Sequence, residues 1–431
     1  MPVNRRMRLV AYLKTGPTAN HGGGWRHPAA RLDDIFTPER YEETARMLEA
    51  ARFDAAFFAD TLGVPDIHKG GFETYLGLGG QITYLEPLTV LPFMMRVTRH
   101  LGLGTTLSTS FYPPYILARL LGSMDVLSGG RMCWNIVTSA TDFEARNFGS
   151  ERLPPKEERY DMADEVLEAC LALWHGWDAD AMVMNKETGQ FVDASKVRYA
   201  DYQGKYVSTK GPLGVPRSPQ DHPVFMQAGS SPRGREFAAR WAELIFSTPA
   251  FKDASQDYYT DIKTRMVAKG RDPESCAILP SLAVVVGETE SIAQEKLEYL
   301  HSLLNPDLQQ ASISNTVGID LSKPLPDDDT SGARGIQGSL DRVVLKAKRE
   351  GISLAEAAKK PRSVMVGTPE SIADQMEDWF VNRACDGFVV WPTTSPGMFE
   401  DFCRMVVPVL QKRGLVQKEY GGGTLRENLG R

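Results

Sequence analysis

Residues 101–138, LGLGTTLSTSFYPPYILARLLGSMDVLSGGRMCWNIVT, carry the pattern on which the fold prediction rests. Residues 101–109 and 131–138 are short runs rich in apolar and β-branched side chains, which is typical of β-strands. The stretch between them is long enough for a crossover helix, and a strand, a helix and a parallel strand form a βαβ unit. The same alternation recurs along the chain. It predicts eight strands, at residues 7–13, 54–60, 101–109, 131–138, 223–229, 244–248, 278–286 and 387–392.

Several of these runs, such as AAFFA at 55–59, are apolar without alternation, which indicates strands covered on both faces. Eight such strands with helices between them predict one (β/α)8 TIM-barrel domain over residues 1–431, with a doubly wound sheet as the alternative. Three insertions interrupt the pattern. We expect them to form a lid over the C-terminal face of the barrel, and they span residues 61–81, 175–221 and 304–362.

The composition argues against nucleic acid and membrane partners. The formal net charge is −6, and no apolar run approaches the ~18 residues of a membrane-spanning helix. The five cysteines are far apart and form no CxxC pair, so we expect reduced thiols and a cytoplasmic protein.

Several common catalytic motifs are missing from the sequence. It contains no GxGxxG after the first strand, no phosphate-binding GxxxxGK[ST], no HExxH and no GxSxG. Only seven histidines are present, and only His21 and His27 are close in sequence. We therefore predict no metal site and no hydrolase triad.

Polar residues do occur at the ends of the expected strands, where barrel active sites are built. Asp60 ends the second strand, Thr106 lies late in the third and Asn135 lies late in the fourth. After the fifth strand, the turn QAGSSPRG brings Ser230 and Ser231 to the start of a helix. Free backbone N–H groups and hydroxyls at a helix N-terminus predict a phosphate site. Trp391, at the end of the eighth strand, is interpreted as filling the barrel.

Longer motifs resemble one branch of the bacterial-luciferase-like flavoproteins, the branch of nitrilotriacetate and dibenzothiophene-sulfone monooxygenases. The resemblance runs in order from about residue 8 to the C-terminus. The segments that carry it are LGTTLSTSFYPPYILARLLGSMDVLSGGRMCWNIVTSATDFEARNFG, ERYDMADEVLEACLALW, QAGSSPRGREFAA, GTPESIADQMEDWF, DGFVVWP and VVPVLQKRGLVQKEYGGGTLRENLG.

This resemblance implies a monooxygenase that uses O2 and reduced FMN, with the FMN supplied by a separate NAD(P)H-dependent flavin reductase. It implies a barrel assembled as a homodimer or homotetramer. The family's flavin contacts map onto Asp60, Thr106, Tyr160 and Ser231, with Asn135 lining the site. Where relatives commonly have a histidine four residues before the tyrosine, this chain has Lys156, a cation that can still contact a phosphate.

The substrate implied by the resemblance is a small organic molecule that loses a C–N or C–S bond. His21 and His27, which follow the first strand, are the candidates for substrate contact or proton management. Two alternatives remain open. One is an oxidoreductase that uses a deazaflavin, and the other is a barrel that binds flavin without catalysing a reaction.

Overall fold

Eight parallel strands close into a barrel in the computed structural model, which describes residues 5–17, 21–323, 325 and 329–430. Around the barrel the order is β11-β1-β2-β3-β4-β7-β8-β9, and β9 closes it by pairing with both β8 and β11. The barrel prediction and all eight predicted strands are confirmed. The strands are β1 (Arg8–Leu13), β2 (Ala55–Phe58), β3 (Gly102–Ser108), β4 (Met132–Val137), β7 (Val224–Gln227), β8 (Leu244–Ser247), β9 (Ala277–Val286) and β11 (Gly387–Trp391).

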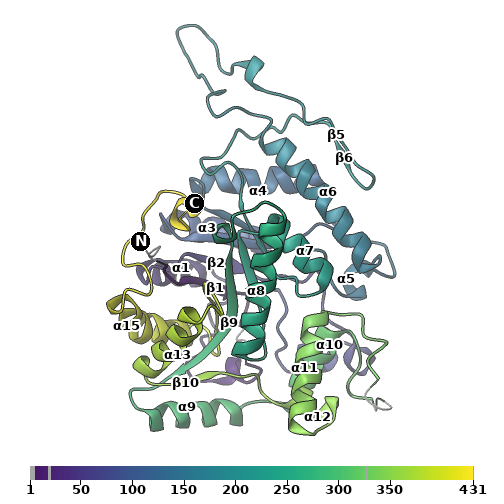
Figure 1. Ribbon diagram of the computed structural model, residues 1–431, viewed down its shortest axis with the longest axis vertical. Helices are drawn as coiled ribbons and strands as arrows, with labels where there is room; N and C mark the ends of the chain where they lie inside the picture. Colours follow the sequence, from purple (N-terminus) through teal and green to yellow (C-terminus); the bar gives the residue numbers. More distant parts are fainter. Residues whose placement is uncertain (1–4, 18–20, 324, 326–328, 431) are drawn as a thin grey trace.

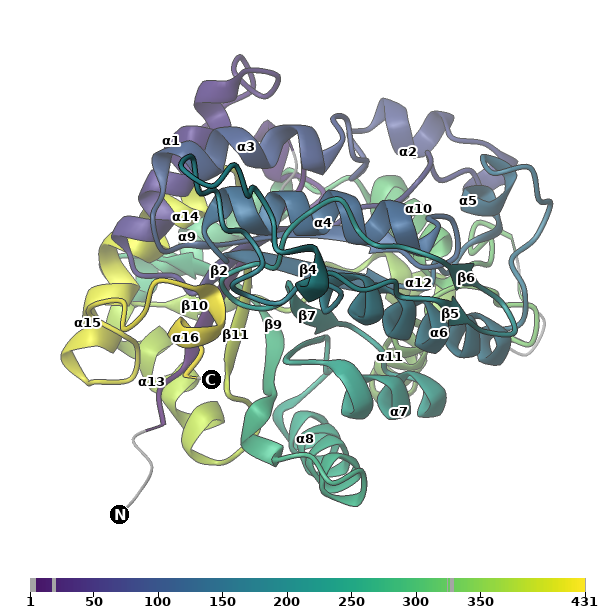
Figure 2. The same cartoon turned by 90° about the horizontal axis from the view of Figure 1, so that it is seen from above.

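A layer of helices surrounds the strands (Figure 1 and Figure 2). Pro369–Val381 forms one of them, and the Thr368 side chain accepts a hydrogen bond from Ser371 N at its start, as the Thr-Pro-Glu sequence predicts. The helices of this layer are α1 (Pro38–Ala50), α3 (Pro87–Val97), α4 (Pro114–Ser128), α6 (Lys156–Trp174), α7 (Pro232–Trp241), α8 (Lys252–Ala268), α9 (Glu290–Ser302), α13 (Pro369–Val381), α14 (Gly397–Asp401) and α15 (Val407–Lys412).

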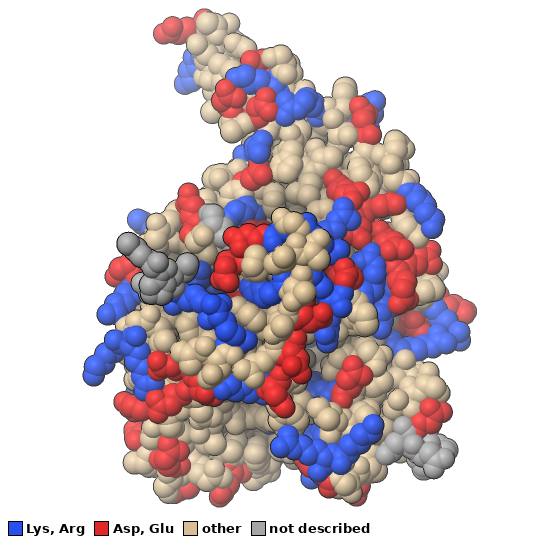
Figure 3. All heavy atoms as spheres, in the orientation of Figure 1, with Lys and Arg blue, Asp and Glu red and all other residues tan. Residues whose placement is uncertain are grey.

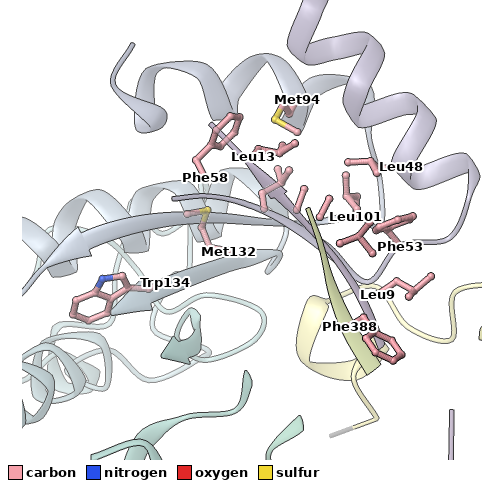
Figure 4. Close-up of a cluster of buried hydrophobic side chains, with 14 of the residues drawn as sticks. Leu9, Leu13, Leu48, Phe53, Phe58, Met94, Leu101, Met132, Trp134 and Phe388 are labelled. Carbon is pink, nitrogen blue, oxygen red and sulfur yellow. The ribbon is translucent and has the colours of Figure 1, made fainter. Parts of the chain in front are cut away.

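The strands are buried on both faces, which explains their unbroken apolar sequences. Inward-facing residues of β1, β2 and β11, such as Val10, Phe57 and Val389, fill the barrel interior. Residues of the opposite face, such as Leu9 and Phe58, pack against the surrounding helices (Figure 4). Because side chains alternate along a strand, the same segments supply both layers.

The C-terminal segment closes the amino end of the barrel. Its short helix α16 (Leu425–Asn428) places Leu425 and Leu429 in the interior cluster, and Leu425 N donates to Gly130 O at 2.9 Å. A Cβ on Gly102 would lie 2.6 Å from Leu425. The amino end is therefore filled by side chains, so a ligand inside the barrel enters from the carboxyl end.

Two of the three predicted insertions pack together at that carboxyl end. The insertion after β2 contains α2 (Glu73–Gly77), and the insertion before β10 (Met365–Gly367) contains α10 (Pro306–Val317), α11 (Gln337–Glu350) and α12 (Leu354–Lys359). Helices α10 and α2 share a buried apolar cluster that includes Tyr75 and Leu308. This contact joins loops that follow different strands, as a lid requires.

The third insertion, residues 175–221, is not part of a lid, so that expectation is wrong. It connects the end of α6 to the start of β7 and therefore leaves the barrel at the amino ends of the strands. It forms an arm that projects from the body and carries the hairpin β5 (Tyr202–Gln203) and β6 (Ser208–Thr209) (Figure 1). A connection from a helix to a strand lies on the face opposite the active site in this fold.

The surface carries both signs of charge. On the face shown in Figure 3, acidic and basic residues are interspersed over most of the molecule. No helix in the described part of the chain combines the length and apolar character needed to cross a membrane.

Candidate active site

Two of the predicted flavin residues meet inside the barrel. Thr106 on β3 and Asn135 on β4 are register partners, and Asn135 Nδ2 donates to Thr106 Oγ1 at 2.8 Å. Thr106 Oγ1 in turn donates to Phe58 O at 2.8 Å. Asn135 Oδ1 is buried and accepts from no residue that the structure describes. Leaving such an acceptor unpaired costs about 1–3 kcal/mol, so its position indicates a donor that a ligand would supply.

Asp60 lies at the same corner, two residues beyond Phe58. It is half-buried, and its Oδ1 accepts from Thr61 N at 2.7 Å. Lys14, which follows β1, donates to Gln81 O at 3.2 Å. Burial lowers the pKa of Lys14 to about 8, and the charge of Asp60 opposes this shift. Lys14 is a site residue that the sequence analysis did not identify.

A buried glutamate organises the loops around this corner. Glu144, in α5 (Asp142–Arg146), accepts from Ser139 Oγ at 3.1 Å and from Thr141 Oγ1 at 3.0 Å. It also accepts from Leu62 N at 3.4 Å, which links the loop after β4 to the loop after β2. Glu144 was also missed, because its contact with Leu62 joins loops that are far apart in sequence.

The predicted phosphate turn is assembled between α6 and α7. Ser231 caps α7 by accepting from Gly234 N at 3.2 Å, and the Tyr160 hydroxyl lies next to the side chains of Ser231 and Gln227. A Cβ on Gly234 would lie 2.7 Å from the Tyr160 hydroxyl. Burial raises the pKa of Tyr160, so its hydroxyl stays protonated and can donate at neutral pH.

The remaining phosphate candidates, Ser230 and Lys156, border this turn. A Cβ on Gly338 of α11 would lie 2.3 Å from Ser230 Oγ, so the insertion packs directly against the turn. Lys156 is half-buried in the first turn of α6, four residues before Tyr160. It forms no hydrogen bond or ion pair with any residue that the structure describes.

The two histidine candidates lie in the loop after β1, beside α9. His21 is buried, its Nδ1 accepts from Gly23 N at 3.1 Å, and its ring stacks on His301 with centroids 5.6 Å apart. Burial lowers the pKa of His21 to about 4, so it is neutral at pH 7. His27 Nδ1 accepts from Ala29 N at 3.0 Å, and its ring lies 5.4 Å from that of Tyr299. The contacts described for this pair join it to α9 rather than to Asn135 or Ser231.

Aromatic side chains form the wall of the barrel mouth across from Thr106 and Asn135. The Trp391 ring lies 4.7 Å from Tyr12 and 5.3 Å from Phe246, measured between centroids. Trp391 thus packs with other aromatics, as interpreted from the sequence, but its buried Nε1 has no hydrogen-bond partner among the described residues. The guanidinium of Arg362 lies 5.3 Å from the ring centroid of Trp391.

A cavity of about 400 Å³ opens beside Asp60, between the insertion after β2 and α5. Its lining residues are Thr61, Gly63, Val64, Asp66, Ile82, Thr83, Phe143, Arg146 and Asn147. The cavity is therefore bounded by the same two loops that Glu144 links.

One cluster elsewhere has the residue types of a metal site. His175, Asp221 and His222 lie close together at the base of the arm. Asp221 is already paired with His175 at 3.0 Å and with Arg217, while Arg426 approaches His222 Nδ1 to 3.3 Å. Two guanidinium groups oppose a bound cation, so these contacts explain the cluster as an ion-pair network.

Similarity to known proteins identifies the family of this chain. The model of the luciferase-like monooxygenase family matches residues 17–387. The chain belongs to the luciferase-like monooxygenase family. It is 42% identical to dibenzothiophene-sulfone monooxygenase of Rhodococcus erythropolis (strain XP), covering 100% of this chain and 98% of that protein. It is 36% identical to nitrilotriacetate monooxygenase component A of Aminobacter aminovorans, covering 100% and 97%. The branch expected from the motifs is therefore confirmed, and the protein is a monooxygenase of the flavin-dependent type.

Two solved structures share the fold over nearly the whole chain. The long-chain alkane monooxygenase LadA superposes with a TM-score of 0.90 at 34% identity, covering 99% of this chain and 96% of LadA. Riboflavin lyase RcaE, solved with modified FMN and riboflavin, superposes with a TM-score of 0.91 at 30% identity, covering 99% and 96%.

Proposed function

We propose that the protein is the oxygenase component of a two-component system that uses reduced FMN and O2 to oxidise a small organic substrate, with cleavage of a C–N or C–S bond. One observation carries the proposal. At the carboxyl end of the barrel, the unpaired Asn135 Oδ1 lies on β4, and the turn of Ser231 and Gly234 follows the neighbouring strand β7. The unpaired acceptor of Asn135 can receive a hydrogen bond from a polar ring, and the turn at Ser231 can bind a phosphate. The two together fit a ligand that has both groups.

The residues present fit FMN. The turn would hold the phosphate through the Ser230 and Ser231 hydroxyls, the Tyr160 hydroxyl and the N-terminus of α7. Asn135 and Asp60 offer acceptors to the rest of the cofactor. Bound reduced FMN supplies the activation of O2, which amino-acid side chains cannot perform.

The chain's own task is to orient the reactants and keep water away from them. The packing of α10 on α2 covers part of the mouth, and the aromatic wall of Tyr12, Phe246 and Trp391 excludes water from that side. His21 is neutral at pH 7, so its ring can donate or accept a hydrogen bond but carries no positive charge at that pH.

A separate flavin reductase that uses NAD(P)H would supply the reduced FMN. One relative is named as component A of its monooxygenase, which supports a division between two proteins. We infer a homodimer or homotetramer, as in the family. All five cysteines are unpaired, which supports a reducing compartment such as the cytoplasm.

The activity is tested by mixing the purified protein with an NADH-dependent FMN reductase, FMN, O2 and candidate sulfones, thioethers and aminopolycarboxylates. Product should form only when all components are present. Sulfones should release a sulfinate, thioethers a thiol and an aldehyde, and amine substrates a dealkylated amine and an aldehyde, as detected by mass spectrometry. Turnover with reduced deazaflavin but not with reduced FMN would contradict the proposal.

A matched pair of variants connects this activity to the site. Asn135→Ala removes the unpaired acceptor and should weaken the binding of reduced FMN by about 10-fold or more, equivalent to about 1.4 kcal/mol. Asn185→Ala removes an exposed asparagine of the arm and should leave binding unchanged. If the two variants bind reduced FMN with equal affinity, Asn135 does not contact the cofactor.

A further inference from the structure

A lysine at the barrel mouth has unused hydrogen-bond donors. The ammonium of Lys14 donates to Gln81 O at 3.2 Å. Burial lowers its pKa to about 8, and the negative charges of Asp60 and Glu144 oppose this shift. Within the described part of the chain, Lys14 forms a contact ion pair with neither carboxylate, and two of its three N–H groups donate to no acceptor.

The side chain of Lys14 continues the row of residues that face the barrel interior. On β1, Val10 belongs to the interior cluster and Tyr12 packs against it, whereas Leu13 packs outward. Ala59 N donates to Leu13 O at 3.0 Å, so the pairing of β1 with the chain of β2 extends to this point. Because side chains alternate along a strand, Lys14 lies on the same side as Tyr12, one step nearer the carboxyl end.

The charged neighbours of Lys14 show which part of the mouth it faces. Asp60 follows β2, and Glu144 lies in α5, after β4. Both carboxylates act on the charge of Lys14, so its ammonium lies on the side of the mouth formed by β2, β3 and β4. Asn135 Oδ1, on β4, is buried there without a donor. Unused donors and an unused acceptor therefore belong to the same side of the mouth.

These groups restrict the kind of ligand that fits. A compact anion such as phosphate would accept from Lys14, but Asp60 and Glu144 would repel it, and it has no N–H to offer to Asn135. A ring edge that combines a negatively charged acceptor with N–H donors can pair with the lysine and with the acceptors at once. Hydrogen bonds to a charged partner of this kind are the strong ones.

The ring of reduced FMN has such an edge. Reduced flavin loses a ring proton near neutral pH and then carries a negative charge while it keeps N–H donors, whereas the oxidised ring is neutral. A positive charge next to the ring therefore stabilises the reduced form more than the oxidised form. This difference matters to an oxygenase that receives reduced FMN from another protein, because oxidised FMN competes for the same site.

We propose that Lys14 donates to the negatively charged edge of the reduced FMN ring and gives the site its preference for reduced over oxidised FMN. This assignment rests on the proposed function. It deepens that function by naming the residue through which the site distinguishes the two oxidation states of the cofactor.

The test compares the affinities of the purified protein for reduced and oxidised FMN, measured without O2 by quenching of tryptophan fluorescence. The reduced form should bind about 10-fold more tightly or better. The midpoint potential of bound FMN checks this ratio independently, since each tenfold preference raises the potential of a two-electron couple by about 30 mV. Equal affinities for the two forms would overturn the proposal.

Lys14→Met should weaken the binding of reduced FMN by about 10-fold or more and change the binding of oxidised FMN by less than about 3-fold. Lys348→Met, an exposed position on α11, should retain the preference. If Lys14→Met weakens both forms equally, Lys14 only supports the loop around Gln81, and the proposal is wrong. The preference of the unaltered protein tests the proposal even if the variant does not fold.

These measurements separate this inference from the proposed function. If the protein oxidises thioethers with reduced FMN and Lys14→Met leaves the ratio of affinities unchanged, the function stands and the role of Lys14 is wrong. If neither form of FMN binds, the proposed function is wrong, and this inference is wrong with it.

Discussion

At the scale of single residues, the site contains buried polar and charged groups that lower the stability of the fold because they lack a hydrogen-bond partner or are removed from water. Asn135 Oδ1 and Trp391 Nε1 are buried without a hydrogen-bond partner among the described residues, and both residues belong to strands of the barrel. Lys14 adds a desolvated charge beside Asp60. Native proteins tolerate such groups mainly where function requires them.

Lys14 gives a prediction about pH. The folded protein lowers the pKa of Lys14 from 10.5 to about 8, so the folded chain holds this proton less tightly than the unfolded chain. The charged lysine therefore destabilises the fold below about pH 8, and this cost disappears as the pH rises from about 8 to about 10.5.

Lys14→Met should accordingly raise the free energy of unfolding at pH 6.5 by about 1–3 kcal/mol, allowing for partial exposure and for the lost bond to Gln81. The gain should shrink toward pH 10. Urea unfolding at both pH values, with Lys348→Met as the control, measures it. A gain that is independent of pH would contradict the assigned charge.

At the residue level, the sequence could predict which residues lie together where strand ends determine their position. Asp60 follows β2, Thr106 and Asn135 lie near the ends of β3 and β4, and parallel strands bring their carboxyl ends to one rim. Their role in flavin binding stays a prediction. Lys14 and Glu144 were not predicted, because their roles depend on contacts with residues 81 and 62, which no local pattern reveals.

At the scale of elements, the turn between β7 and α7 leaves no room for a side chain at Gly234. Gly234 lies so close to Tyr160 and Gly229 that a methyl group would displace the hydroxyl or the turn. Pro408 lies in the first turn of α15, and because proline has no N–H to donate, the helix passes through a π-helical segment, Phe402–Val406, just before it.

Gly234→Ala should therefore weaken the binding of reduced FMN by about 10-fold or more, about 1.4 kcal/mol, because the added Cβ would lie 2.7 Å from the Tyr160 hydroxyl. Gly214→Ala is the matched control, since a Cβ there meets no atom within 4 Å. Fluorescence titration gives both affinities, and thermal melts verify folding. If Gly234→Ala binds reduced FMN with unchanged affinity, the turn is not part of the cofactor site.

At the scale of the whole molecule, the order of strands and helices along the chain determines which end of the barrel each insertion faces. The incorrect placement of residues 175–221 in the lid could have been avoided from the sequence. Residues 175–221 follow a predicted helix, and a segment that follows a helix returns to the amino ends of the strands. The packing of α11 against the phosphate turn through Gly338 could not be predicted, because the periodicity of α11 identifies an apolar face but not what that face packs against.

The central claim is that FMN binds across the carboxyl mouth, with its phosphate at the turn of Tyr160, Ser230 and Ser231. A crystal structure of the protein soaked with FMN tests it most directly. The account predicts phosphate oxygens within hydrogen-bond distance of the Ser231 and Tyr160 hydroxyls, and a ring-edge donor on Asn135 Oδ1. A phosphate seated at Arg362 and Trp391, or FMN bound outside the barrel mouth, would contradict it.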